Sequence, residues 1–546
     1  MSTTRSWPSV LWVETRRGVR PRRTAGTTPL LAAAVRRDRV MIACTLGLLA
    51  ILAAGSDRAT RGLYPAGSHI PAGLLGTMRN AAFVAMYGPL PQPTSIDAIG
   101  VSKVLLTGGL GVAILAQMIV RRHTRAEEES GLAELIAAQT VGRHAPLTAA
   151  LLLAAGSAVA CSVAGAAALV VVGAPVGGAL DFGLCWVVIG LTGAGLAAVG
   201  AQVAGSGRGA GQFGLIALAV LYLVRMIGDT TAAPVSWLSP LGWASRSEPF
   251  GANHYWVIVP GLLLFAVLTL ASYTLLDRRD LGAGLLPQRR GAAHGRITGN
   301  AGLVWRLLRS TVAGWMACFA LLGIVVGSLT GSLSGSSGAA VERMLRSLGA
   351  GHGSLIDLYL ATEISVGALI ATAAGITVIS HLATEERARR LDSVLASPVS
   401  RSRMLTPYVC WAFALPAGSM VVFTAVIGLT DRLTGSGAHA SIGPLLRSGA
   451  ATFPAMWATV AVSILLFGVG HRWTPISWAV LVLAAAVAQF GDLLSLPAWL
   501  RTWSPFDHLA AFPADNLPRT SLAALTVMAA LALAGGITAY LRRDVE

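Results

Sequence analysis

Charged side chains inside apolar stretches are the first candidates for chemistry, because a charge is costly in an apolar setting unless it is paired or used. Five candidates stand inside such stretches or at their edges. They are Lys103, Arg225, Asp229, Glu363 and Asp492. All lie toward the same end of the predicted helices, and we find no ionisable side chain in the middle of any of them. A proton relay needs such residues, so this distribution disfavours proton-driven chemistry.

A second group of candidates lies in two polar loops, 126–143 and 384–401, which have the same design. Each begins with acidic residues, ends with an arginine and carries apolar residues at helical spacing, which predicts a short amphipathic helix. The charged positions are Glu127, Glu128, Glu134 and Arg143 in the first loop, and Glu385, Glu386, Asp392 and Arg401 in the second. Any solvated helix could have this charge order, but its repetition at matched positions favours a docking role.

Motifs for catalysis or cofactor binding are missing from the sequence. A P-loop needs a lysine after its glycines, and the one lysine, Lys103, stands in Val-Ser-Lys-Val. We find no H-E-x-x-H, paired C-x-x-C or G-x-S-x-G, and the ten histidines are dispersed. The sequence therefore predicts no catalytic residue, no metal site and no bound cofactor.

Composition identifies the elements that position these residues. The 546-residue chain is 54% hydrophobic and only 12% charged, which leaves too little polar surface for a soluble protein of this size. A membrane helix needs about 20 apolar residues. Twelve runs qualify: 40–55, 100–120, 145–172, 180–204, 211–228, 254–276, 312–332, 358–380, 404–429, 446–470, 474–494 and 519–541. The prediction is an all-α polytopic membrane protein embedded in the lipid bilayer.

Basic residues set the expected orientation. The net charge of +16 comes from short clusters beside the apolar runs and not from one basic face, so we expect no nucleic-acid partner. Most of the 41 Lys and Arg residues fall on the inside if the N-terminus is cytoplasmic. We therefore expect a multi-pass protein of the plasma (inner) membrane with both termini in the cytoplasm.

The sequence also repeats itself. At a shift of 258 positions, His123 falls on His381, Glu128 on Glu386 and Arg143 on Arg401. Such repeats are common in transporters. Because each half has an even number of helices, the two repeats are parallel. The predicted divisions are a first six-helix half at 1–276, a cytoplasmic linker at 277–300 and a second six-helix half at 301–546. Amphipathic segments at 30–39 and 303–309 could lie on the membrane surface or simply extend the first helix of each half.

At this point the residues resemble a known family, the ABC-2 type exporter permeases. They resemble most the fused, double-length actinobacterial permeases for polyketide antibiotics of the tetronasin type, and mycobacterial multidrug-efflux permeases. The resemblance rests on the loop ending at Leu391–Arg401, its weaker copy ending at Gln139–Arg143, Tyr87-Gly88-Pro89, and the WLSPLGW segment at Trp237–Trp243. The first copy departs from the pattern at Thr140, where proline is usual, which puts its coupling in doubt.

The resemblance implies a permease subunit that exports hydrophobic or amphipathic compounds, such as drugs and antibiotics, and so contributes to antibiotic resistance. By this resemblance it would have no nucleotide site of its own and would work with two copies of a separate ABC ATPase, which would bind ATP and Mg²⁺. The two polar loops would be the coupling loops. Re-entrant hairpins would lie at about 229–253 and 495–518.

Two alternatives remain open on the residues alone. One is a 6+6-helix secondary drug transporter of the major-facilitator kind, and the other is a membrane enzyme or assembly factor. For the permease we also predict a translocation path or outer gate, formed by Lys103, Glu363, Arg225, Asp229 and Asp492. At the repeat shift Lys103 falls on Ala361, two residues from Glu363, so the two charges would lie at similar depth and could pair.

Overall fold

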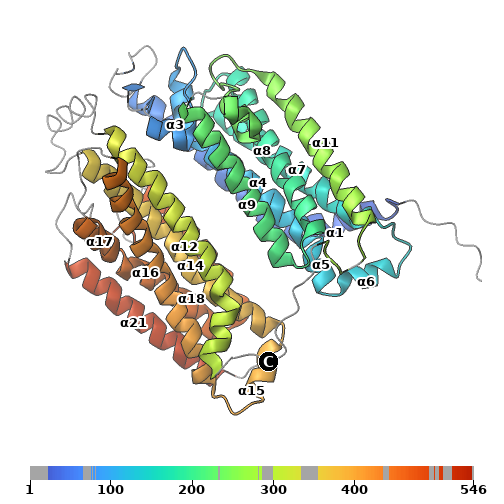
Figure 1. Ribbon diagram of the computed structural model, residues 1–546, viewed down its shortest axis with the longest axis vertical. Helices are drawn as coiled ribbons and strands as arrows, with labels where there is room; N and C mark the ends of the chain where they lie inside the picture. The colour runs from blue at the N-terminus through green and yellow to red at the C-terminus, as the bar shows by residue number, and fades with distance from the viewer. Residues whose placement is uncertain are drawn as a thin grey trace, which may run out of the picture. The chain divides into compact units, whose positions relative to one another are not determined.

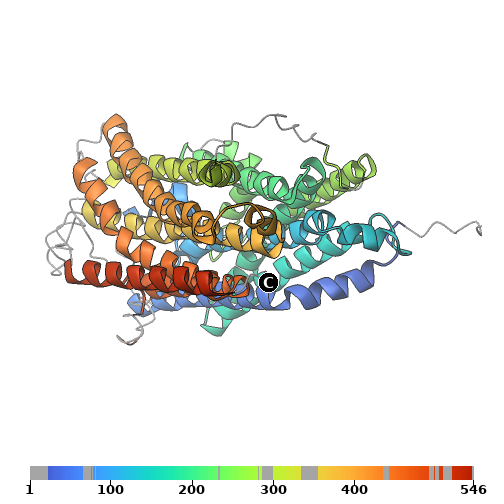
Figure 2. The same ribbon diagram turned by 90° about the horizontal axis from the view of Figure 1, so that it is seen from below.

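The computed structural model describes residues 23–64, 70, 75–76, 78–79, 81–231, 234–280, 282–285, 299–333, 355–434, 442–490, 497, 503–507 and 519–543. All regular structure in these residues is helical, as predicted (Figure 1). The long helices of each half run side by side along a common direction, as a second view also shows (Figure 2). The sequence explains this fold class, since its long runs of Ala, Leu, Val and Gly satisfy their backbone groups only within helices when placed in lipid.

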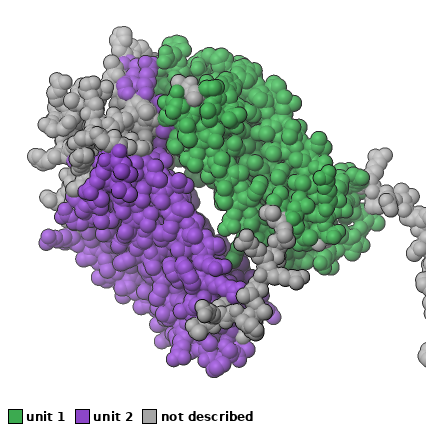
Figure 3. Space-filling model, viewed as in Figure 1, with its two compact units in different colours: residues 1–61, 87–290 green, residues 62–86, 291–546 purple. Residues whose placement is uncertain are grey.

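The chain forms two compact units (Figure 3). Unit 1 comprises Met1–Arg61 and Tyr87–Arg290, and unit 2 comprises Gly62–Met86 and Gly291–Glu546. The change from unit 1 to unit 2 after Arg290 falls within the segment 277–300 that the sequence marks as a linker.

Unit 1 is a bundle of six long helices with short helices at both ends. The long helices are α1 (Thr27–Leu63), α4 (Ile96–Arg122), α7 (Ala145–Val171), α8 (Val176–Val203), α9 (Gly207–Thr231) and α11 (Ile258–Asp277). The short ones are α5 (Arg125–Glu129), α6 (Leu132–Ala137), η1 (Pro234–Leu238), α10 (Pro240–Ser245) and η2 (Tyr255–Val257). Helix α3 (Ala81–Tyr87) belongs to unit 2 except for its last residue.

Helix α8 is the centre of unit 1. It is the most deeply buried span of this unit and packs against α4, α7, α9 and α11. Its Trp186 is fully buried and donates from Nε1 to the carbonyl of Leu105, 2.9 Å away. The indole fits because it faces Gly108 and Gly165, where a Cβ would overlap the ring. Small residues thus let the helices approach closely, as is usual where lipid supplies little driving force for helix association.

Unit 2 has a corresponding order of helices. They are α12 (Gly299–Leu333), α14 (Leu355–Arg387), α15 (Arg390–Leu395), α16 (Arg401–Thr434), α17 (Ile442–Ala451), α18 (Phe453–Val469), η3 (His471–Trp473), α19 (Ile476–Phe490) and α21 (Arg519–Arg542). Helix α12 packs along α16, and α18 packs along α21. Gly468 and Gly536 bring the backbones of α18 and α21 into contact.

Eleven helices among the described residues are long and apolar enough to cross a membrane. The remaining predicted run, 474–494, corresponds to α19, which ends at Phe490 where the described residues stop. The segments 30–39 and 303–309 are not separate elements, because each forms the first part of one continuous helix, α1 or α12. Of the two predicted hairpins, most of 495–518 lies outside the described residues.

Candidate functional site

The first polar loop folds into two short helices at the end of unit 1 where α4 and α8 end. Helix α5 is followed by Gly131, whose φ of 76° takes the chain into α6. This left-handed conformation costs glycine little. No residue of α6 is buried, and Leu135 is 68% exposed. The loop therefore presents an apolar helix to its surroundings, in agreement with the predicted amphipathic pattern.

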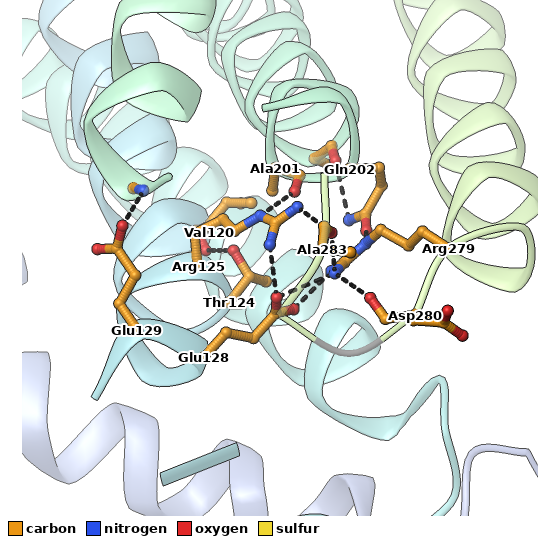
Figure 4. Close-up of polar contacts among 12 residues, drawn as sticks. Val120, Thr124, Arg125, Glu128, Glu129, Ala201, Gln202, Arg279, Asp280 and Ala283 are labelled. Atoms are coloured by element: carbon orange, nitrogen blue, oxygen red, sulfur yellow. Dashed lines mark hydrogen bonds and ion pairs between the residues drawn. The ribbon is translucent and has the colours of Figure 1, made fainter. Parts of the chain in front are cut away.

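Glu128 anchors this loop to the last helix of unit 1 (Figure 4). Its two carboxylate oxygens accept from Nη2 and Nη1 of Arg279, at 2.5 and 2.9 Å. Arg125 donates to the same carboxylate from Nη1, at 2.8 Å. Both arginine side chains are almost fully buried, at 1% and 3% exposure. A single carboxylate thus accepts charge-assisted hydrogen bonds from two buried guanidinium groups.

The other donors of these arginines bind the end of α8 and the chain beyond α11. Arg279 donates from Nε to Oε1 of Gln202 at 2.7 Å, and Arg125 donates from Nε to the carbonyl of Ala201 at 2.6 Å. Arg125 also reaches the carbonyl of Ala283 at 2.8 Å (Figure 4). The loop, the central helix and the last helix of unit 1 therefore share one hydrogen-bond network.

Arg143, at the end of the loop, completes the attachment. Its Nη2 donates to the carbonyls of Leu276 and Arg279, at 2.8 and 2.5 Å. These carbonyls lie at the end of α11, where the last carbonyls of a helix have no partner within the helix. Arg143, which stands just before α7, therefore caps the C-terminal end of α11.

Glu127 connects the loop to α1. His123 lies between two carboxylates, with Nε2 2.7 Å from Asp38 and Nδ1 3.2 Å from Glu127. A neutral imidazole has one N–H, so it can donate to only one of two ionised carboxylates. Arg122 and Arg37 supply further positive charge, on Asp38 and Glu127 respectively.

The second polar loop repeats the later part of the first, although α14 continues to Arg387 where unit 1 has the separate helix α5. Helix α15 spans the positions that match α6 at the shift of 258 residues. Arg389 occupies the position of Gly131 and also has a positive φ, of 53°. Unlike α6, helix α15 is packed onto its unit, because Leu391 is buried in an apolar cluster with Leu382 and Met404.

The charged attachments are repeated as well. Nη2 of Arg543, just beyond α21, lies 2.5 and 2.7 Å from the two oxygens of Glu386. Arg401 donates to the carbonyl of Arg543 at 2.6 Å, as Arg143 does to that of Arg279. Glu385 pairs with Arg390 at 3.2 Å. We call each Glu–Arg pair, Glu128–Arg279 in unit 1 and Glu386–Arg543 in unit 2, a carboxylate–arginine latch.

The remaining predicted residues lie elsewhere. Glu134 and Asp392 are exposed on α6 and α15. Arg225 and Asp229 form a fully buried pair within α9, 3.5 Å apart. Lys103 is exposed on α4 of unit 1 and Glu363 is half-buried on α14 of unit 2, so their pairing stays a prediction. Asp492 lies outside the described residues.

The predicted hairpin at 229–253 folds back against its own bundle. Ser239 donates to the carbonyl of Leu221 at 2.7 Å, and Ser247 donates to Asp181 at 2.6 Å. In unit 2, Ser504 makes the matching contact to the carbonyl of Ala484, at 3.1 Å. A short re-entrant segment therefore lies at the end of unit 1 opposite the polar loop.

Sequence reasoning missed several of these residues. Asp181 stands inside a predicted helix and is fully buried, but it was not among the candidates. Arg279 and Arg543 lie just after the last helix of each half, and the repeat is the signal that could have paired them. Among the described residues no three His, Cys, Asp or Glu side chains form a group that could hold a metal ion.

The fold, the duplicated loops and the re-entrant segment define a multi-pass helical membrane protein of the permease class. A family model described as the C-terminal domain of the multidrug efflux system permease Rv1217c matches residues 297–541. The multidrug efflux system permease protein Rv1217c of Mycobacterium tuberculosis (strain ATCC 25618 / H37Rv) is 33% identical over 526 residues, which cover 95% of each chain. The chain belongs to this family of multidrug efflux permeases.

Proposed function

We propose that this chain is the membrane-spanning subunit of an ATP-driven exporter. It moves hydrophobic or amphipathic compounds, such as drugs and antibiotics, out of the cell, and two copies of a separate ABC ATPase supply the energy. Both termini and both polar loops are on the cytoplasmic side in this proposal.

The observation that carries the proposal is the duplicated loop. Each unit has one short helix at the same repeat position, and each loop is fixed by a latch to the end of the last helix of its own unit. Two similar loops would offer two docking places, one for each copy of a partner. The name of the Mycobacterium tuberculosis relative supports drug efflux as the transported class.

The lipid-facing surface supports an apolar cargo. Spans α1, α9, α11 and α21 expose large apolar side chains, among them Ile51, Ile216, Leu263 and Leu531. Such surfaces are suited to contact with acyl chains, where hydrophobic compounds concentrate. A cargo of this kind can enter a permease sideways from the bilayer without crossing water.

The test is reconstitution of the full chain in proteoliposomes, alone and with a separate P-loop ATPase from the same cell. We expect no ATP hydrolysis by the chain alone, a complex with two ATPase copies per permease, and dye export that requires ATP and resists a protonophore. Hydrolysis by the chain alone or a stable one-to-one complex would contradict the proposal. Export that needs a proton gradient and no ATP would instead support the secondary transporter.

A further inference from the structure

The two latches join parts of the chain that are far apart in sequence. Glu128 and Arg279 are separated by 151 residues, and Glu386 and Arg543 by 157. In both units the carboxylate stands at the start of the polar loop and the arginine stands directly after the last helix. The two halves differ in sequence at most positions. An incidental surface ion pair would not be expected to recur at the same place in both of them.

The geometry of the latches is that of a firm attachment. In unit 1 both oxygens of the carboxylate are engaged by two nitrogens of one guanidinium, which fixes distance and orientation together. The acidic side chains are largely shielded, with 12% exposure for Glu128 and 6% for Glu386. Exposed ion pairs contribute little, but shielded bidentate pairs resist separation.

A second contact makes each latch two-sided. The arginine that closes the loop, Arg143 or Arg401, donates to the carbonyl of the latch arginine itself. The loop is thus held to the end of the last helix at its beginning and at its end. A displacement of the loop as a body must displace that helix end or break two charge-assisted contacts.

We propose that Glu128 and Glu386 are positioning residues of the transport cycle, each passing the movement of its polar loop to the last helix of its own unit through the latch arginine. The inference rests on the proposed function, because it assumes that a partner moves the loops. It differs from a docking role, since these carboxylates face their own unit and not a partner surface.

The chain offers matched control variants. Arg278 and Arg542 are exposed arginines directly before the two latch arginines. Arg279→Gln and Arg543→Gln remove the latch charge, whereas Arg278→Gln and Arg542→Gln remove the same charge one residue away. The exchange variants Glu128→Arg with Arg279→Glu, and Glu386→Arg with Arg543→Glu, restore opposite charges in reversed order.

The first measurement uses the permease alone, by hydrogen–deuterium exchange. Breaking a latch should speed exchange in the loop and in the last turn of α11 or α21 together, while the controls should leave both unchanged. In unit 2, the charge-reversed double variant Glu386→Arg with Arg543→Glu should restore slow hydrogen–deuterium exchange in the loop and in the helix end. Faster exchange in the loop without any change in the helix end would overturn the proposal.

The second measurement uses the reconstituted complex and compares dye exported per ATP hydrolysed. Latch variants should bind the ATPase and hydrolyse ATP, but export per ATP should fall by at least about fivefold, the low end for a coupling free energy between sites. Unchanged export per ATP would overturn the proposal while leaving ATP-driven export intact. If ATP does not support dye export by the unaltered complex, the proposed function is refuted. Hydrogen–deuterium exchange of the permease alone would still test whether the latch links the loop to the helix end.

Discussion

The loops 126–143 and 384–401 have a short helix at matched positions but are held in different ways. In unit 1 charge dominates, because Glu128 meets two buried arginines and α6 buries no side chain. In unit 2 one arginine meets Glu386, and Leu391 anchors α15 in an apolar cluster. The matched residues Glu129 and Arg387 even have opposite charge. Glu129 accepts from the backbone N–H of Gly207, and Arg387 donates to the carbonyl of His471.

This difference shows that the repeat has kept the position of the loop and changed the forces that fix it. The loop of unit 1 presents its apolar residues outward, so they are available to a partner. The loop of unit 2 uses an apolar residue internally. The two docking places of the proposed exporter are therefore inequivalent in chemistry, although they lie at matched positions.

The largest expected effect comes from removing Glu128. Glu128→Gln removes the carboxylate that both buried arginines, Arg125 and Arg279, contact, and breaking a buried pair in this way costs about 3–5 kcal/mol. Glu386→Gln should cost less, because Arg543 is 16% exposed and water can reach it. Thermal unfolding in detergent should rank the two variants in this order, with exposed Glu134→Gln as the control. Equal destabilisation by the two Gln variants would show that charged contacts hold the two loops equally.

The second effect tests the apolar side of the comparison. Leu391→Ala should destabilise unit 2 by about 2 kcal/mol, the low end for a buried leucine, because α15 has few other apolar anchors. Leu135→Ala in unit 1 should leave the unfolding temperature unchanged, since that side chain is 68% exposed. If Leu135 serves docking, the same variant should weaken binding of the ATPase. A stability loss at Leu135 as large as that at Leu391 would show that α6 is packed.

A smaller effect concerns the residue before each loop helix. Arg389 has a φ of 53°, a conformation that costs a non-glycine residue roughly 1 kcal/mol. Arg389→Gly should therefore stabilise unit 2 slightly, and Gly131→Ala should destabilise unit 1 by a similar amount. Chemical denaturation of both variants measures the two shifts. Shifts of the same sign would mean that the two turns differ in conformation.

The smallest effect is expected at the link between Glu127 and α1. Arg37 is 49% exposed, so its ion pair with Glu127 contributes at most about 1 kcal/mol. Arg37→Ala should change the unfolding temperature little and the change should vanish at high salt. A large, salt-independent loss would indicate that α1 is held to the loop mainly through this pair.

The sequence predicted the helical fold and the two loops because both depend on local patterns. Apolar runs of about 20 residues and charge order along a short helix are visible without knowledge of distant contacts. The partners of the loop charges were not predicted, since Arg279 and Arg543 are more than 150 residues away from Glu128 and Glu386. Nothing in the local pattern separates Arg279 from its exposed neighbour Arg278.

Burial was the other property that escaped prediction. The sequence placed Arg225 and Asp229 on a polar path without showing that they form a buried ion pair one turn apart in α9. Their place on the path stays a prediction. Asp181 was overlooked because a single acid near a helix start suggests a solvated end. Its partner, Ser247, approaches only because the re-entrant segment folds back.

Lys103 is the only lysine in the chain, and it is exposed on α4. Apart from a free N-terminus, the protein therefore has a single primary amine that can be acylated. A membrane-impermeant amine reagent applied to intact cells would label Lys103 only if the N-terminal end of α4 faces the outside. The lysine-free variant Lys103→Arg is the negative control. One covalent bond would then report which end of α4 faces the outside.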